Sequence, residues 1–431
     1  MATLDSIASI INWIIVIAFA VCFSYQAIYF FARFRRKRAA EIMTLQHRYA
    51  VLIAARNEES VIAALIESIH NQTYKKELVD IYVVADNCTD RTAEIARGCG
   101  AVVYERFNKQ DIGKGYALRH LLRCMNADHK FNEYDGFFIF DADNILDHRY
   151  IEEINKTFSQ GYDVVTSLRN SSNLESSWIS FGYGLWFLHE SRLLNRGRMA
   201  FGSNAFVSGT GYLIRKEVLY DEKGWNWFLM TEDIQFTAEC ILKNRKIGYC
   251  DTAVFYDEQP TSLRVSFHQR MRWVKGYYQV FAQYGMQLIK KCIRDKSLAA
   301  YDMLMVDLPS FVLMAFAGIA GIALLLIGMI AAADTRFVIY SIVMFFMKTY
   351  AGMLILGLYT FFSNRGQIHC TPQKAIIGLL SFPIYMYTYF PIALAAFRRE
   401  VEWKPIRHGD RQIVTKVGNA QIKPYAGGGQ F

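Results

Sequence analysis

The stretch "FFIFDADNILD", residues 137–147, runs a block of large apolar side chains directly into three carboxylates. Such a block is typical of a strand that is buried on both faces of a parallel sheet. Residues that follow such a strand lie at the edge where α/β proteins bind their ligands. Asp141 and Asp143 can hold a hard cation there; alternatively, Asp141 and Asp147 cap a turn and the next helix. We assign Asp147 to the helix cap.

Similar apolar runs precede this stretch, and segments whose apolar residues have helical spacing separate them. This alternation predicts a largely parallel sheet with helices on both faces and right-handed crossovers. Strands are expected at 49–55, 79–85, 101–105 and 136–140, and helices at 59–72, from Asp90, from Lys114 and after Asp147.

Polar and mostly acidic side chains follow the ends of these strands. Because the carboxyl ends of parallel strands meet at one rim, we expect them to converge there. A rim of this kind suits a nucleotide with a divalent cation. The residues are Arg56, Asn57, Glu58, Asp86, Asp90, Glu105, Arg106, Asp141 and Asp143.

Composition favours a soluble domain joined to membrane segments. The 431 residues are 53% hydrophobic and 20% charged, with a formal charge of +9. The Lys and Arg residues crowd beside apolar runs and not along one face of the soluble part, which argues against nucleic-acid binding. Eight cysteines without a CxxC pair or metal-ligand spacing favour a reducing compartment.

Four apolar runs have about the length that a bilayer requires. They cover about 7–32, 308–333, 337–362 and 375–397. The basic "RFRRKR" at 33–38 places the domain that follows in the cytosol by the positive-inside rule.

The number of crossings stays open. One early and three late crossings would place the basic tail outside, so we expect Pro383 and Pro391 to convert the last run into a re-entrant hairpin or an interfacial helix with a short span. Lys348, inside the third run, either faces a polar path or extends its amine to the membrane surface.

Two later segments carry further polar groups. Thr231, Glu232 and Asp233 open a helix, where acidic residues favour the helix dipole or do chemistry. In "SFHQRMRWVKGYYQVF" (266–281) helical spacing separates an apolar stripe from a polar one that includes a Trp. The apolar stripe is Phe267, Met271, Val274, Tyr278 and Phe281, and the opposite stripe is Gln269, Arg272 and Trp273.

Seven motifs in order give the chain a resemblance to a known family. They are "ARNEE" (55–59), "VVADNCTD" (83–90), "GKGYAL" (113–118), "DAD" (141–143), "SGTG" (208–211), "TED" (231–233) and "QRMRW" (269–273). With the flanking apolar spans, this set resembles the processive, membrane-integrated family 2 glycosyltransferases, the group of cellulose, chitin, hyaluronan and poly-N-acetylglucosamine synthases. The resemblance covers about residues 49–410.

The resemblance implies a GT-A fold, with a Rossmann-like mixed, mainly parallel sheet, docked on transmembrane and interfacial helices. It implies a cytosolic catalytic domain on a multi-pass protein of the bacterial plasma membrane. The expected divisions are an anchor with its basic flank at 1–38, the GT-A domain at 39–258, interfacial helices at 259–300, a membrane region at 301–397 and a cytosolic tail at 398–431.

The resemblance also implies roles for single residues. Asp233 is the expected catalytic base, with Glu232 beside it, and Asp143 with Asp141 the expected site for Mg²⁺ or Mn²⁺. The nucleotide and donor residues are Arg56, Glu58, Asp86, Lys114, Asp141 and Arg272. The acceptor residues are Gly209, Thr210, Gln269 and Trp273. In the tail, Trp403, Arg407 and His408 are candidates for a gating segment or form a basic segment at the lipid boundary.

The implied activity is inverting, processive transfer from a UDP-sugar, with glucose as the best candidate, to a growing polysaccharide acceptor that is exported through the membrane. A bacterial cellulose-like or mixed 1,3- and 1,4-linked β-glucan is the favoured product. The expected partners are the donor, the polymer, membrane lipid and possible export proteins. Two alternatives remain: a glycosyltransferase that adds one sugar to a lipid carrier, and a membrane transporter or receptor with a nucleotide-binding domain.

Overall fold

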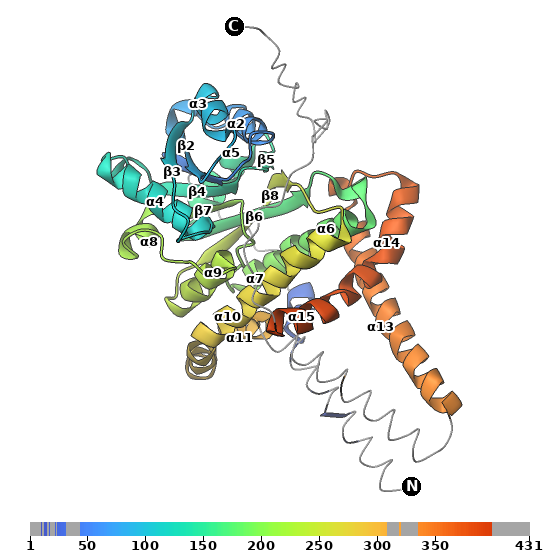
Figure 1. Ribbon diagram of the computed structural model, residues 1–431. Coiled ribbons are helices and arrows are strands. Elements are labelled where there is room, and N and C mark those ends of the chain that lie inside the picture. Colours follow the sequence, from blue (N-terminus) through green and yellow to red (C-terminus); the bar gives the residue numbers. More distant parts are fainter. Residues whose placement is uncertain are drawn as a thin grey trace.

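An eight-stranded sheet is the centre of the computed structural model, which describes residues 44–307, 335–398 and 24–31, with single residues at 10, 13, 14, 17, 22 and 319 (Figure 1). The strand order is β3-β2-β1-β4-β7-β6-β8-β5. The strands are β1 Tyr49–Ala55, β2 Val79–Asp86, β3 Val102–Arg106, β4 Gly136–Asp141, β5 Ile145–Leu146, β6 Val164–Ser171, β7 Tyr212–Arg215 and β8 Ile247–Asp257.

The sheet is mixed and mainly parallel, as the sequence predicts. β3, β2, β1 and β4 are parallel to one another, and β7 is antiparallel to both β4 and β6. β8 returns parallel to β6, and the short β5 is antiparallel to β8. The four expected strands are confirmed to within one residue at each end.

Helices surround the sheet. The helices that precede β8 in the chain are α2 Ile62–His70, α3 Thr92–Gly98, α4 Lys114–Ala127, α5 Tyr150–Phe158, α6 Trp178–Leu188, a π-helix His189–Asn195, α7 Arg196–Phe201, α8 Lys216–Asp221 and α9 Glu232–Leu242. They are followed by α10 Leu263–Asp295, α11 Leu298–Asp307, α13 Thr335–Ser363, α14 Pro372–Tyr387 and α15 Tyr389–Arg398. Short 3-10 turns lie at Lys76–Leu78, Phe131–Glu133, Leu174–Ser176 and Arg365–Gln367.

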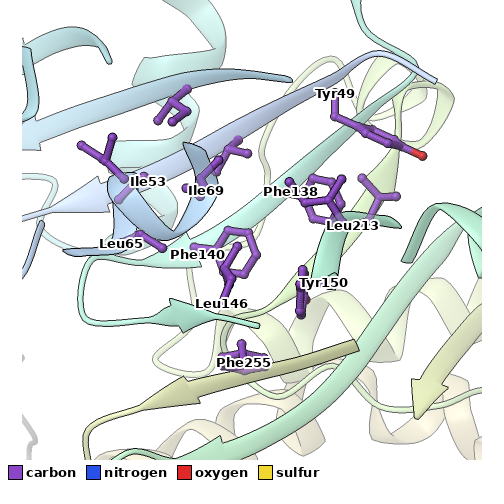
Figure 2. Packing of buried hydrophobic residues seen from close by; sticks show 14 of the residues in the cluster. Tyr49, Ile53, Leu65, Ile69, Phe138, Phe140, Leu146, Tyr150, Leu213 and Phe255 are labelled. Atoms are coloured by element: carbon purple, nitrogen blue, oxygen red, sulfur yellow. The ribbon is translucent and has the colours of Figure 1, made fainter. Parts of the chain in front are cut away.

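The apolar run of β4 is buried on both faces, which explains its lack of alternation. Phe138 and Phe140 pack in the core under α2, α3 and α5, with Tyr150 and Phe255 beside them (Figure 2). Phe137 lies in the other core, under α4, α8 and α9. The strand is therefore a rigid base for the carboxylates at its end.

Two local expectations were wrong. α2 begins at Ile62 and not at residue 59, because the "ARNEE" segment forms the turn that leaves β1. Asp147 is not the cap of α5: the N-cap residue is Arg149, and its backbone N–H donates to Asp147 Oδ1 at 3.1 Å. Asp147 therefore holds the turn that precedes the helix.

The apolar stripe of α10 is divided between two partners. Met271 and Val274, with Phe267 and Tyr278, pack against α15. Phe281 instead belongs to the cluster with α9 and α11. The stripe therefore packs against two neighbours, because α10 is long enough to cross from one to the next.

The expected membrane region is helical where the structure describes it. α13 matches the expected run at 337–362 and extends away from the sheet (Figure 1), with Lys348 exposed. Among the described residues, one segment, Pro372–Arg398, is long and apolar enough to cross a membrane. Pro383 lies inside α14, so the break falls at Thr388 and not at the prolines. Most of the runs at 7–32 and 308–333 lies outside the described residues.

Candidate active site

The donor side of the rim begins at the end of β2. Asp86 is its last residue, and its Oδ1 accepts from Arg106 Nη1 at 2.5 Å, with both side chains 7% exposed. Arg106 Nη2 also donates to the Asp111 carbonyl at 2.7 Å. The carboxylate expected to bind the nucleotide base is therefore held in place by an arginine from the next strand.

The "ARNEE" turn lies beside it, because β1 and β2 end at the same level. Asn57 has a left-handed φ of +57°, and its side-chain oxygen accepts the Thr89 N–H at 2.8 Å. The Glu58 N–H donates to Thr92 Oγ1, also at 2.8 Å. These contacts tie the turn with Arg56 and Glu58 to the start of α3, on the same rim as Asp86.

Lys114, the first residue of α4, crosses to the end of β4. Its Nζ donates to Asp141 Oδ1 at 2.5 Å and to the Gly209 carbonyl at 2.8 Å. Burial alone would lower the pKa of Lys114, but the nearby Asp141 and Glu232 raise it above its ordinary value. The lysine is thus a fixed cation that connects the "DAD" turn with the "SGTG" turn.

The "DAD" turn is held from behind by buried polar groups. Thr210 Oγ1 accepts the Asp141 N–H at 2.9 Å and donates to Asn144 Oδ1 at 2.5 Å. Asn144 Nδ2 in turn donates to Asp143 Oδ1 at 3.2 Å. Thr210 is only 2% exposed, and its hydroxyl orders the turn.

The last residue of "SGTG", Gly211, lies where only a glycine fits. Its φ is +70°, and a Cβ built there would lie 2.2 Å from Phe255 Cε1. No side chain fits, because the turn lies directly on the core of β8.

Glu232 and Asp233 are the first two residues of α9 and are partly buried in the site. Burial raises the pKa of Glu232 to about 7, and the Lys114 ammonium opposes this shift. Burial also raises the pKa of Asp233, while the Ile234 and Gly209 backbone N–H groups lower it. A carboxylate held with a raised pKa is a suitable proton acceptor near neutral pH.

α10 presents Arg272 of the "QRMRW" motif to the same space. Burial lowers the pKa of Arg272, and Glu232 and Asp141 oppose this shift. Its Nε is buried and has no hydrogen-bond partner in the described part of the chain. An unsatisfied guanidinium N–H beside two carboxylates is suited to an incoming phosphate or hydroxyl oxygen.

Tyr183 of α6 positions the other two residues of this motif. Its hydroxyl donates to Gln269 Oε1 at 2.8 Å, and its ring meets that of Trp273 edge to face at 5.7 Å. The Trp on the polar side of α10 is therefore one wall of an aromatic group that is available to a sugar ring.

The backbone of α10 at Gly276 packs directly against the side chain of Thr231, at the start of α9. A Cβ on Gly276 would lie 2.3 Å from Thr231 Oγ1, so only glycine permits this approach. This contact fixes the first turn of α9, which carries Asp233, against α10.

The carboxylates of the "DAD" turn fit a divalent cation that the substrate helps to bind. The described residues contain no group of three or more His, Cys, Asp or Glu side chains that could hold a metal. Asp141 and Asp143 supply two carboxylates, and Lys114 already neutralises Asp141 as a cation would. Mg²⁺ typically takes one or two carboxylates and completes its shell with substrate phosphates and water.

An ion pair that sequence reasoning missed lies beside this turn. Arg169 of β6 donates from Nε to Asp257 Oδ2 at 2.8 Å and from Nη1 to the Ser208 carbonyl at 3.1 Å. Asp257 Oδ1 is buried without a partner among the described residues. Asp257 ends the apolar run of β8 as Asp141 ends β4, which is the sequence signal that could have identified it.

The structure brings the predicted donor, base and acceptor residues to one rim, between β1, β2, β4, α9 and α10. It does not include Trp403, Arg407 and His408, which lie outside the described residues. A parallel half of the sheet, an antiparallel β7, a carboxylate pair after β4 and an acidic helix start opposite it are the features of a GT-A glycosyltransferase.

The chain belongs to the family described as "Glycosyltransferase like family 2", whose model matches residues 47–276. It is 26% identical over 276 residues to a beta-monoglucosyldiacylglycerol synthase of Nostoc, which covers 61% of this chain and 56% of the relative. It is 23% identical over 362 residues to a poly-beta-1,6-N-acetyl-D-glucosamine synthase of Staphylococcus epidermidis, which covers 80% of each. The chain thus spans little more than half the length of the first of these relatives.

A solved structure shares the fold over most of the chain. It is the mannosyltransferase PcManGT from Pyrobaculum calidifontis in complex with GDP-Man and Mn²⁺, with a TM-score of 0.58 and 16% identity, over 92% of this chain and 99% of that one. The expected GT-A fold and glycosyltransferase class are confirmed, and a transporter or receptor is not supported.

Proposed function

We propose that this chain is an inverting, processive polysaccharide synthase. It transfers a sugar, with glucose as the best candidate, from a UDP-sugar to the end of a growing β-glycan at the inner face of the plasma membrane, and passes the polymer outward. The observation that carries the proposal is that Lys114 and Asp233 meet at Gly209: Lys114 Nζ donates to the Gly209 carbonyl at 2.8 Å, and Asp233 Oδ2 lies 3.9 Å from the position of a Cβ on Gly209. The Asp233 carboxylate also opposes the fall in the pKa of Arg272.

The residues divide the chemistry between them. Asp233 accepts the proton of the acceptor hydroxyl as that oxygen attacks the anomeric carbon, and its raised pKa suits this task. Arg272 and Lys114 lie where the departing diphosphate gathers negative charge, and the free Nε of Arg272 gives that charge a donor. No second acid is needed, because the diphosphate leaves without protonation.

Asp143 and Asp141 would hold Mg²⁺ or Mn²⁺ on the diphosphate, and the metal would supply Lewis-acid stabilisation of the leaving group. On the donor side, Asp86 with Arg106 and the turn with Arg56 and Glu58 orient the nucleotide. Support for a metal comes from the relative whose structure contains Mn²⁺. Since that structure contains GDP-Man, the identity of the donor base needs a direct test.

Polymer synthesis is favoured by the continuity between the site and the apolar helices. Trp273 and Tyr183 pack in one cluster with Phe382 of α14, so the acceptor wall adjoins the segment long enough to cross a membrane. The relative that makes poly-beta-1,6-N-acetyl-D-glucosamine aligns over 80% of the chain.

A second candidate is the transfer of one sugar to a lipid. The beta-monoglucosyldiacylglycerol synthases align with 26% and 25% identity over 276 residues, and the same apolar helices would bring a lipid acceptor to the rim.

One experiment separates the two. The full chain is purified in detergent and given labelled UDP-glucose, UDP-N-acetylglucosamine or GDP-mannose singly, with Mg²⁺ or Mn²⁺ and with or without diacylglycerol. We expect a high-molecular-weight product that linkage-specific hydrolases digest and that Asp233→Asn does not make. A label found only in the organic phase, and only with diacylglycerol, would overturn the polymer proposal.

A further inference from the structure

A cavity outside the catalytic rim lies between the π-helix and the end of α13. It has a volume of about 70 Å³. That is room for several waters or one compact polar group, since a single water needs about 10–15 Å³ on this measure. The lining residues that matter here are His189, Arg192, Arg196, Thr360, Ser363 and Asn364.

Two buried groups in the lining have unmet hydrogen-bonding capacity. His189 Nδ1 and Asn364 Oδ1 have no partner in the part of the chain that the structure describes, and their residues are only 2% and 4% exposed. Burial, with Arg198 nearby, lowers the pKa of His189 to about 4, so the ring is neutral at pH 7. Buried polar groups normally have partners, and two in one cavity indicate a polar ligand.

The cavity is also positively charged. Arg192 forms a bidentate pair with Asp251, with both N–O distances 3.0 Å. Arg196 lies 3.6 Å from the same carboxylate, and its side chain is 52% exposed. Two guanidinium groups share one carboxylate, which leaves a net positive charge and free N–H donors on Arg196 for an anion.

The position of the cavity indicates where such an anion comes from. α13 exposes a series of large apolar side chains up to its last turn, where Ser363 and Asn364 begin the polar segment. The exposed residues are Val343, Phe346, Met347, Ile355 and Phe362. The cavity therefore lies where an apolar helix meets the polar domain, which is the level of lipid headgroups if α13 lies in a bilayer.

We propose that this cavity binds the phosphate-bearing headgroup of an anionic phospholipid, whose acyl chains lie along the exposed face of α13. Arg196 and Arg192 bind the phosphate. Asn364 Oδ1 accepts a headgroup hydroxyl, which a glycerol headgroup supplies. The proposal goes beyond the glycosyl transfer described above and shares with it only the location at a membrane.

The site is distinct from the catalytic one although the two share the π-helix. Glu190, the residue after His189, is turned to the "SGTG" segment, where Ser208 Oγ donates to its carboxylate at 3.4 Å. Consecutive residues of a π-helix thus serve two sites, and π-helical segments are frequent at functional sites.

The test is a titration of phosphatidylglycerol into the full chain in mixed micelles, with bound lipid counted by native mass spectrometry and phosphatidylcholine as the reference lipid. We expect preferential binding of phosphatidylglycerol. Arg196→Gln should weaken it about fivefold, the usual effect of one cation near an anionic lipid. Ser363→Phe, which fills the cavity from an exposed position without a change of charge, should weaken it at least as much.

The matched control is Arg123→Gln, which removes an exposed arginine of α4 and should leave lipid binding unchanged. Equal loss in this control would show general surface electrostatics and overturn the proposal. So would phosphatidylglycerol binding that Ser363→Phe leaves intact, or displacement of the lipid by inorganic phosphate at equal concentration. Because binding is counted directly, these outcomes do not depend on whether the chain makes a polymer or a glycolipid.

Discussion

The donor rim, where β2 and β4 end, and the transfer centre, where α9 begins beside Arg272 of α10, differ in how their charges are compensated. On the rim, Asp86 is paired with Arg106 and Asp141 with Lys114, each at 2.5 Å. In the centre, Glu232 and Asp233 have raised pKa values, and the Nε of Arg272 has no hydrogen-bond partner among the residues that the structure describes. The rim is therefore organised before a ligand arrives, and the centre keeps charges that only a substrate can satisfy.

This difference separates binding from chemistry. A preformed ion pair keeps its geometry, and in the proposed function one of its members turns to the nucleotide. Substitutions there should therefore change the stability of the fold and the affinity for the donor. A carboxylate whose charge is not fully compensated accepts a proton more readily. Substitutions in the centre should therefore change the turnover rate.

The largest expected effect is in the centre. Asp233→Asn removes the proton acceptor and should reduce turnover about a hundred- to ten-thousand-fold, the usual contribution of a positioned base. Donor affinity should change little, because the rim is intact. Labelled sugar transfer and calorimetric UDP-sugar binding measure the two quantities, with Asp295→Asn at the exposed end of α10 as control. Equal loss of both would remove the distinction between the two regions.

The next effect is on the rim. Asp86→Asn leaves Arg106 buried without its partner charge, and breaking such a pair costs about 3–5 kcal/mol of the free energy of unfolding. The double variant Asp86→Leu with Arg106→Met should recover most of this stability but not donor binding. Chemical denaturation measures the free energy of unfolding of these variants, and UDP-sugar titration measures their affinity for the donor. If the single variant is as stable as the wild type, the rim is not preorganised by this contact.

The pH dependence reports on the centre. Burial raises the pKa of Glu232 from 4.5 to about 7, so the fold favours its protonated form. Its contribution to stability is full below about 4.5 and is lost as the pH rises through about 7. Activity should change with pH in the opposite direction and increase as the pH rises, because Asp233 must be deprotonated to accept a proton. Glu232→Gln cannot ionise and should therefore remove the loss of stability that accompanies a rise of the pH through about 7. Chemical denaturation at several pH values measures this, and an unchanged loss would show that Glu232 is not the group that titrates there.

The smallest effect is expected at the acceptor wall. Tyr183→Phe removes the hydroxyl that donates to Gln269 and should raise the KM for acceptor up to about tenfold, as the loss of one hydrogen bond does, with kcat nearly unchanged. Initial rates against acceptor concentration measure this. A fall in kcat without a change in KM would place Tyr183 with the chemistry.

The parallel half of the fold was predictable because its signals are local. Each strand is a continuous apolar run, and each polar residue of the rim directly follows one. The role of Asp233 could be inferred only by resemblance, because acidic residues at a helix start are also ordinary dipole partners.

What could not be predicted depends on contacts between distant segments. The pairing of Arg169 with Asp257 joins β6 to β8, 88 residues apart. The π-helix follows α6 without a local signal in the residues, and the division of the α10 stripe depends on which helices lie along it. The prediction for Asp147 was wrong because its position in the sequence fits both a helix cap and a turn, and in the structure it lies in the turn before α5.

The contact between Gly276 and Thr231 has a mechanical consequence. With a bare backbone on one side and a small hydroxyl side chain on the other, a tilt of α10 is not absorbed by side-chain rearrangement and displaces the first turn of α9. α10 is also packed along α15 in the apolar segment. If α15 lies in a bilayer and Asp233 is the base, as proposed above, the thickness and lateral tension of that bilayer should set the distance between Asp233 and the sugar, and the turnover rate should respond to the membrane.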